Sequence, residues 1–239
     1  MGTLYVVATP IGNLQDISLR AIDILIRVKI IACEDTRHTG LLLKYIRENK
    51  LSTQDIVKPT LLSYYEEIEF KRIPQVLNAL SNGFDVALVS DAGTPTISDP
   101  GFKLVRECIT QGIKVESIPG PSAVISSLVV SGLPTDKFLF LGYLPKKSGK
   151  RKNLLNELLR PFETSKQIHP TIIFFESPHR LLEALEDLKE VLGDVNIVIA
   201  RELTKIHEEV RREKISESIS HFNEVVPKGE FVILFHLES

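Results

Sequence analysis

Apolar and polar residues alternate along the first half of the chain in a way that is typical of an α/β protein. Short apolar runs, which predict strands, are separated by longer amphipathic stretches, which predict helices. The predicted strands cover residues 4–8, 30–33, 61–63, 86–90 and 115–118. Because a helix separates successive strands, the pattern predicts a mixed and largely parallel sheet.

Apolar residues at helical spacing fill the gaps between these strands. One helical face is marked by Leu19, Ile22, Leu25 and Ile26, and another by Ile73, Val76, Leu77 and Leu80. For the helix before residue 115, Asp99 is the predicted N-cap and Pro100 the first helical residue. Gly112 is its predicted C-terminal stop.

The turn Pro119-Gly120-Pro121-Ser122 is the predicted domain boundary, because two prolines around a glycine interrupt both helices and central strands. We therefore expect an N-terminal α/β domain over residues 1–119 and a C-terminal α/β domain over residues 120–239. The second domain has predicted strands at 138–141, 171–175, 196–200 and 231–235. Its helix over 181–192 is expected to be capped by Ser177-Pro178 and closed by Gly193.

The composition is that of an ordinary globular protein without an overall charge for binding a polyanion. Of 239 residues, 43% are hydrophobic, and 29 Lys and Arg against 31 Asp and Glu give a formal net charge of −2. Nucleic-acid contacts must therefore be local. No apolar run approaches the roughly 18 to 20 residues of a membrane span, and no secretory leader is apparent, so we expect a cytoplasmic protein. Cys33 and Cys108 predict buried, reduced thiols.

Three turns rich in glycine and proline directly follow predicted strands. They are Thr9-Pro10-Ile11-Gly12-Asn13, Ser90-Asp91-Ala92-Gly93-Thr94-Pro95 and Pro119-Gly120-Pro121-Ser122. Each alone is best interpreted as a tight turn, but parallel strands place all three along one sheet edge, where α/β proteins bind ligands. Neither GxxxxGK nor GxGxxG occurs, which disfavours nucleoside triphosphates and ordinary dinucleotides. Asp91 suits the ribose of a nucleoside without polyphosphate, or equally an Asx-turn.

The densest polar cluster, Glu34-Asp35-Thr36-Arg37-His38-Thr39, follows the predicted strand 30–33. Its carboxylates and guanidinium are able to orient or deprotonate a hydroxyl. The alternative, which the residues alone slightly favour, is a helix N-terminus capped by Asp or Thr, with Arg37 in a surface ion pair. The six histidines are scattered and neither HExxH nor CxxC occurs, so we expect no catalytic metal.

A basic run packs five cations into seven residues: Lys146, Lys147, Lys150, Arg151 and Lys152. Contact with an RNA backbone is the functional interpretation. The alternative is a solvated loop or the N-terminal segment of a helix, because charge runs are usually just exposed.

Six sequence blocks carry a resemblance that extends over nearly the whole chain. They are Thr9–Leu14, Glu34–Gly40, Ser90–Pro95, Pro119–Ser122, Phe174–Arg180 and Ala200–Lys205. Together and in this order they resemble the ribosomal RNA small subunit methyltransferase I family, a branch of the tetrapyrrole (corrin/porphyrin) methylase superfamily. The agreement of six blocks is far more specific than any one of them.

The resemblance implies a two-domain, tetrapyrrole-methylase-like α/β fold with mixed, mostly parallel sheets and S-adenosylmethionine in the cleft between the domains. It implies methyl transfer to a cytidine ribose 2′-hydroxyl in small-subunit ribosomal RNA, by a homodimer. Methylation of a small tetrapyrrole and a non-catalytic nucleoside-binding role are the alternatives.

Carried over block by block, the resemblance also implies site residues. The cofactor contacts would be Pro10, Ile11, Gly12, Ser90, Asp91, Gly93, Thr94, Ser122, Ala123, Glu176 and Leu203. Glu34 falls where tetrapyrrole methylases have a proposed acid/base aspartate, and it is the first catalytic candidate. Asp35 and Arg37 beside it are the others.

Overall fold

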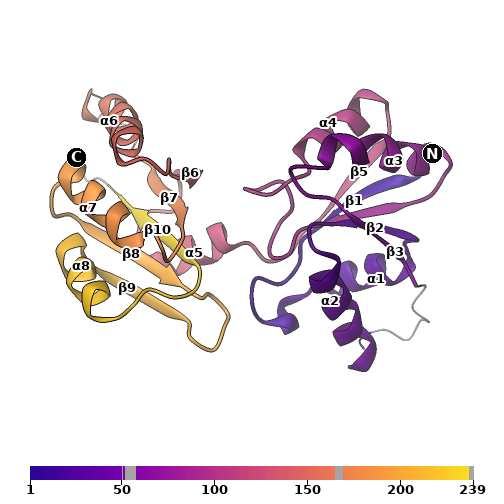
Figure 1. Cartoon of the computed structure of the whole chain (residues 1–239), viewed down its shortest axis with the longest axis horizontal. Coiled ribbons are helices and arrows are strands. Elements are labelled where there is room, and N and C mark those ends of the chain that lie inside the picture. The colour runs from indigo at the N-terminus through magenta and orange to yellow at the C-terminus, as the bar shows by residue number, and fades with distance from the viewer. Residues whose placement is uncertain (50, 52–57, 165–168, 237–239) are drawn as a thin grey trace. The chain divides into compact units, whose positions relative to one another are not determined.

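The computed structural model describes residues 1–49, 51, 58–164 and 169–236. Contacts between residues divide the chain into two units, Met1–Ser122 and Ala123–Ser239, which we call the first and the second unit. Each unit is built around its own five-stranded sheet (Figure 1). Among the described residues, no helix is both long enough and apolar enough to cross a membrane.

The first unit contains an all-parallel sheet with the strand order β3-β2-β4-β1-β5. Its strands are β1 (Thr3–Val7), β2 (Ile30–Cys33), β3 (Thr60–Ser63), β4 (Val86–Val89) and β5 (Lys114–Ile118). All five predicted strands of this half are confirmed. Every residue of the central strand β4 is buried, which explains its continuous apolar run.

Helices cover both faces of this sheet. They are α1 (Leu19–Arg27), α2 (Thr36–Glu48), α3 (Glu69–Ser81) and α4 (Phe102–Thr110), with a short 3-10 helix, η1, at Leu14–Asp16. The helices α1 and α2 pack on one face, and α3 and α4 on the other (Figure 1). Cys33 and Cys108 are buried free thiols, as predicted.

The start of α4 differs from the prediction. Asp99 and Pro100 lie in the preceding loop, and the N-cap is Gly101, with a φ of 129°. A Cβ at this position would lie 2.7 Å from Leu88 Cδ2, so the backbone passes too close to the sheet for a side chain. Close packing, rather than a side-chain cap, therefore fixes where the helix begins. The stop at Gly112 is confirmed by its φ of 69° just after the helix.

The second unit contains a mixed sheet with the strand order β6-β7-β10-β8-β9. Its strands are β6 (Phe138–Tyr143), β7 (Thr171–Glu176), β8 (Asn196–Arg201), β9 (Glu209–Lys214) and β10 (Phe231–Phe235). The β6 and β7 pair is parallel, and the other three pairs are antiparallel. Four of these strands were predicted, whereas the edge strand β9 was not.

Four helices flank this sheet: α5 (Ala123–Ser131), α6 (Ser148–Thr164), α7 (Leu181–Leu192) and α8 (Ile215–Glu224). The helices α6, α7 and α8 cover one face and α5 the other (Figure 1). The predicted cap of α7 at Ser177-Pro178 is wrong, because Arg180 is the N-cap and the chain makes a turn before it. Gly193 closes α7 as predicted, with a φ of 78°.

Arg151, in the first turns of α6, is completely buried in the second unit. Its Nε donates to Asp187 Oδ2 at 2.6 Å, and its Nη2 lies 2.9 Å from Glu183 Oε1. Asp187 also accepts a hydrogen bond of 2.8 Å from Ser148 Oγ. These groups compensate the buried charge, so Arg151 holds α6 against α7 and is not available to an RNA phosphate.

We predict that Arg151→Ala lowers the free energy of unfolding by about 3–5 kcal/mol, because it leaves the Asp187 carboxylate buried without its cation. Urea denaturation followed by circular dichroism measures this change. The exposed neighbour supplies a control, since Lys150→Ala should change stability by less than about 0.5 kcal/mol. Equal denaturation midpoints for the two variants would show that the ion-pair network does not stabilise the unit.

Candidate functional site

The three glycine- and proline-rich turns meet at the carboxyl edge of the first sheet. Thr9 N–H donates to Gly93 O at 2.8 Å, and Gly93 N–H donates back to Thr9 O at 3.0 Å. Thr94 Oγ1 donates to Pro121 O at 3.1 Å and so ties the second turn to the third. These contacts confirm that the turns lie together, as expected for turns that follow parallel strands.

The first two turns approach each other closely. Gly93 has a φ of 80°, and a Cβ there would lie 3.4 Å from Ile11 Cγ2. Pro10 and Ile11 are buried, whereas Gly12 is exposed. Ser90 is also buried, and its Oγ has no hydrogen-bond partner within the described part of the chain. A buried hydroxyl without a partner is costly, so this turn presents a polar group that a ligand can satisfy.

The Asp91 carboxylate connects the loops that follow the neighbouring strands β4 and β2. Its Oδ1 accepts from Asp35 N–H at 3.0 Å, and its Oδ2 lies 2.9 Å from His38 Nδ1. Asp91 therefore bonds to the loop after β2 and to the first turn of α2. Its side chain remains about 30% exposed at the sheet edge.

Asp35 and Arg37 form the helix cap and the surface ion pair that the sequence offered as the alternative to a catalytic role. Asp35 is the N-cap of α2, and its Oδ1 accepts from Arg37 N–H at 2.7 Å. The Arg37 guanidinium also pairs with this carboxylate, with an Nε to Oδ1 distance of 3.0 Å. Hydrogen bonds from Arg37 hold the pKa of Asp35 well below its usual range. This carboxylate is therefore a poor proton acceptor.

Glu34 lies one residue earlier, in a different environment. Burial raises its pKa, and the nearby charges of Asp99 and Asp91 raise it further. Its proton affinity is therefore closer to that needed by an acid/base group working near neutral pH. Of the two adjacent carboxyl groups, Glu34 is the stronger candidate.

Glu34 also lines a cavity of about 450 Å³ that lies entirely within the first unit. The segment after β3, the loop before α4 and the first turn of α4 form its wall. The cavity wall includes Tyr65, Glu66, Glu67, Asp99, Phe102 and Lys103. None of these residues was predicted to belong to a site, although the polar and aromatic stretch 64–67 follows a predicted strand at the same sheet edge.

A buried acid, Glu69, supports this cavity. It accepts from Tyr64 OH at 2.9 Å and Gly101 N–H at 3.1 Å, and it pairs with Lys103 Nζ at 2.9 Å. Burial opposes its ionisation, but the bonds from Lys103 and Tyr64 outweigh this effect and lower its pKa. Glu69 is thus a fixed anion that joins β3, α3 and α4 around the cavity.

Asp35, His38 and Asp91 also bring one potential metal-ligand atom each within 4.8 Å of one another. Arg37 already pairs with Asp35, and Asp91 bonds to both His38 and the backbone of residue 35. These side chains satisfy one another, so the cluster receives no metal assignment.

In the second unit, Glu176 ends β7 and is almost completely buried. Its Oε1 accepts from Ser177 N–H at 2.8 Å and pairs with the Arg180 guanidinium. Its Oε2 has no hydrogen-bond partner among the described residues. Glu176 therefore offers a second buried polar atom that a ligand can satisfy.

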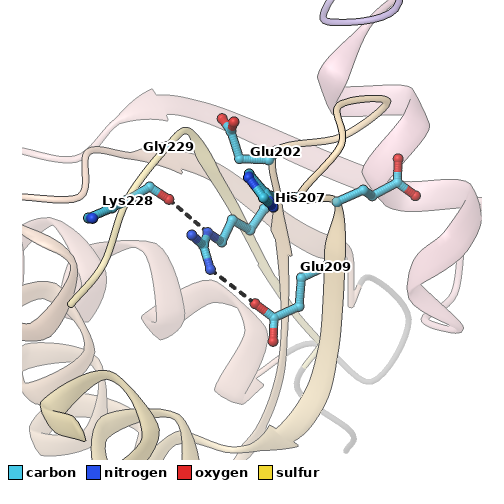
Figure 2. A pocket seen from close by; sticks show the side chains of 7 residues that line it. Glu202, His207, Glu209, Lys228 and Gly229 are labelled. Carbon is cyan, nitrogen blue, oxygen red and sulfur yellow. Dashed lines mark hydrogen bonds and ion pairs between the residues drawn. The ribbon is translucent and has the colours of Figure 1, made fainter. Parts of the chain in front are cut away.

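Leu203 is buried in the loop between β8 and β9. This loop borders a hollow of about 490 Å³, shown in Figure 2 with Glu202, His207 and Glu209 around it. Arg201 Nε donates to Lys228 O at 2.7 Å, the upper dashed line in Figure 2. These contacts fix the loop that carries Leu203.

The five cations of the basic run differ in exposure and in pairing. Lys146, Lys147 and Lys150 are exposed just before and within the first turn of α6. Lys152 Nζ pairs with Glu190 Oε1 at 2.9 Å, and Arg151 is buried. Three of the five cations therefore remain as candidates for phosphate contact.

Comparison with known proteins shows the family to which the chain belongs. The model of the family Tetrapyrrole (Corrin/Porphyrin) Methylases matches residues 3–218. Ribosomal RNA small subunit methyltransferase I of Thermotoga maritima is 47% identical over 234 residues, which cover 98% of each chain. The protein of the same name from Hydrogenobaculum sp. is 46% identical over 239 residues, covering 99% of this chain and 96% of its own. The chain belongs to the ribosomal RNA small subunit methyltransferase I family.

A solved structure confirms the fold of this family member. Uroporphyrin-III C-methyl transferase from Thermus thermophilus, complexed with S-adenyl homocysteine, superposes with a TM-score of 0.61. The match covers 98% of this chain and 97% of the other, at 17% sequence identity. The α/β fold predicted from the resemblance, of tetrapyrrole-methylase type, is therefore confirmed.

We predict that Glu34→Gln and Asp35→Asn change stability in opposite directions at pH 7. The folded-state pKa of Glu34 is raised, so wild type loses stability as pH rises above the unfolded carboxyl value of about 4.3, and the amide variant does not. The folded-state pKa of Asp35 is lowered, so its ionised form stabilises wild type above about pH 3.9.

Thermal unfolding between pH 3 and pH 8 measures both effects. Glu34→Gln should melt above wild type at pH 7 and Asp35→Asn below it, and both differences should shrink toward the acid end. The same sign for both variants at pH 7 would contradict the assigned environments.

Proposed function

We propose that this protein transfers the methyl group of S-adenosylmethionine to the ribose 2′-hydroxyl of a cytidine in small-subunit ribosomal RNA. The observation that carries the proposal is the identity of 47%, over 98% of both chains, with a relative named ribosomal RNA small subunit methyltransferase I. The choice of a ribose hydroxyl and of cytidine follows the resemblance described above. The site geometry adds a carboxyl group suited to proton transfer.

The residues of the first unit fit the adenosine-bearing cofactor. The buried Ser90 Oγ lacks a partner, and the close backbone approach at Gly93 leaves a surface without side-chain bulk. No cationic phosphate cradle is needed, because the cofactor carries no phosphate. We propose that the cofactor contacts here are Pro10, Ile11, Gly12, Ser90, Asp91, Gly93, Thr94 and Ser122. In the second unit, we propose Ala123, Glu176 with its unpartnered Oε2, and Leu203.

The chain's own task in the reaction is positioning and proton transfer. When bound, the cofactor supplies a methyl group that is already activated on a sulfonium. The turns tied together through Thr9, Gly93 and Thr94 form a rigid edge that restricts where a ligand can lie. The Glu34 carboxylate would accept the hydroxyl proton as the sugar oxygen takes the methyl group, while the methyl–sulfur bond breaks and leaves a neutral thioether. Its raised pKa improves it as an acceptor relative to Asp35.

Methylation of a small tetrapyrrole is the competing function. The cavity beside Glu34 is lined by Glu66, Glu67, Glu69 and Asp99, and among the described residues of its lining Lys103 is the one cation. A tetrapyrrole with carboxylate side chains would meet like charges there, whereas a neutral nucleoside would not. The charge of the cavity therefore favours a ribonucleoside.

We also propose that the enzyme acts in the cytoplasm as a homodimer. The resemblance supports the homodimer, and assembly of the small ribosomal subunit, which supplies the substrate, supports the cytoplasm. Sedimentation of the purified chain at micromolar concentration tests the dimer directly.

We predict that the protein incorporates a labelled methyl group into RNA of small ribosomal subunits that lack the modification. Glu34→Gln should lower kcat about 10²- to 10⁴-fold, because the hydroxyl proton loses its acceptor. Asp35→Asn should cause a smaller loss, since that carboxylate is engaged with Arg37. Filter-bound radioactivity followed by nuclease digestion measures rate and position.

The alternatives give different results in the same assay. Cofactor binding without transfer to RNA would support a nucleoside-binding protein, and label in a porphyrinogen but not in RNA would support the tetrapyrrole function. Undiminished methylation by Glu34→Gln would remove that residue from the mechanism.

We predict that replacing Lys146, Lys147 and Lys150 together with glutamine flattens the salt dependence of subunit binding. Each lost phosphate contact should reduce the slope of log K against log salt by about 0.7 to 0.9. Filter binding between 50 and 200 mM salt measures the slope. Lys152→Gln is the matched control, since its ammonium is paired with Glu190. An unchanged slope in the triple variant would place the RNA contacts elsewhere.

A further inference from the structure

We propose that the cavity beside Glu34 is a pocket for the extruded base of the target nucleotide, and that its carboxylates select cytosine by accepting from the exocyclic amine. This inference rests on the proposed function, because it assumes that an RNA ribose is the methyl acceptor. The cavity is separate from the turns assigned above to the cofactor.

The location of the cavity is the first argument. Glu34 is part of its wall, so whatever fills the cavity lies within reach of the proposed proton acceptor. Its volume of about 450 Å³ falls within the range of sites that enclose small ligands. A base turned out of its strand fits such a site, as it does in enzymes that act on a base and extrude it into a pocket.

Aromatic side chains at the cavity supply the second argument. Phe102, the first residue of α4, is 62% exposed, and Tyr65, just after β3, is 38% exposed. Both line the same cavity although 37 positions separate them in the sequence. Proteins that bind single-stranded RNA stack unpaired bases on exposed aromatic rings, and such stacking is sequence-tolerant. These rings therefore provide affinity for a base rather than selectivity.

The charge of the cavity supplies the selectivity. Glu66 and Glu67 are exposed acceptors on the wall, whereas Glu69 is saturated by its own partners. Carboxylate oxygens accept hydrogen bonds from the cytosine amine, but they repel the carbonyl oxygen that uracil carries in the same place. The anionic wall also disfavours entry of a phosphate, so the base can enter while the backbone stays outside.

The backbone around the cavity is held in an uncommon conformation. Thr96 and Ser98 have φ values of 75° and 62°, and Gly101 has a φ of 129°. Non-glycine residues with such values carry strain and persist where surrounding structure enforces them. The buried carboxylate of Glu69 holds one end of this loop, through the hydrogen bond that it accepts from Gly101 N–H. The cavity wall is therefore anchored at Gly101 before any ligand arrives.

Kinetics with unmethylated small ribosomal subunits test the aromatic part of the proposal. Phe102→Ala should raise KM for the subunits about tenfold through lost stacking, with the Kd for S-adenosylmethionine unchanged. Phe102→Trp should recover most of the wild-type KM, which a purely structural role would not predict. Phe84→Ala is the matched control, because Phe84 is also an exposed phenylalanine of the first unit but lies outside the cavity.

Base selection is tested after the methylated nucleotide of the wild-type reaction has been mapped. Subunits reconstituted on transcripts with uridine at that position should be methylated at least about tenfold more slowly than those with cytidine. The double variant Glu66→Gln/Glu67→Gln should lose most of this preference, because an amide can donate to the uracil oxygen.

The outcomes separate the two proposals. If wild type labels RNA but Phe102→Ala leaves KM unchanged, or wild type accepts uridine as well as cytidine, the pocket assignment is wrong and the proposed function stands. If wild type transfers no label to RNA, the proposed function fails and the pocket assignment fails with it.

Discussion

The two backbone hydrogen bonds between Thr9 and Gly93 are the interaction on which the site depends. They join the turns that follow β1 and β4, which are adjacent in the parallel sheet. Gly93 has a φ of 80°, which L side chains rarely adopt, so glycine is what permits this turn, and a Cβ there would be in ordinary contact with Ile11. With these turns fixed, Ser90 and Asp91 hold defined positions at the sheet edge. The chemistry is therefore built on backbone geometry.

At this sheet edge, the pKa values of two consecutive carboxyl groups shift in opposite directions. Glu34 and Asp35 both follow the end of β2, but their side chains meet different surroundings. Asp35 caps α2 and meets Arg37, which favours its ionised form. Glu34 turns toward partial burial and toward Asp99 and Asp91, which favour its protonated form. A single residue of displacement thus separates a structural carboxylate from a candidate proton acceptor.

The sequence was sufficient to predict strands and helices whose buried residues form an apolar pattern. It was insufficient where packing between distant residues or pairing of charges decides whether and where an element forms. The strands β1, β2 and β4 of the first sheet are buried enough to show as apolar runs. The edge strand β9 is different, because its side chains are largely charged and pair along the strand, as Arg211 does with Glu213 at 2.7 Å. The start of α4 depends on the contact of Gly101 with Leu88, which is distant in sequence.

The burial of Arg151 could have been predicted from the spacing of the apolar residues that follow it. Arg151 lies four and eight residues before Leu155 and Leu159, which are both buried, so helical periodicity alone places it on the inner face of α6. Because lysines surround Arg151, the whole segment was expected to be exposed to solvent. Its partner Asp187 lies on α7, and only the fold brings the two charges together. The run of positive residues in the sequence therefore did not predict which of its cations are buried in ion pairs and which are exposed.

The distribution of charge explains how a chain with a net charge of −2 can act on a polyanion. Long-range attraction is weak, so the proposed function requires local contacts with RNA, for which the exposed Lys146, Lys147 and Lys150 are the candidates. The acidic cavity around Glu34 then discriminates between the parts of a nucleotide. It disfavours the phosphate and accepts the neutral base and sugar, so the same carboxylates that would weaken general RNA binding restrict which atoms reach the proton acceptor.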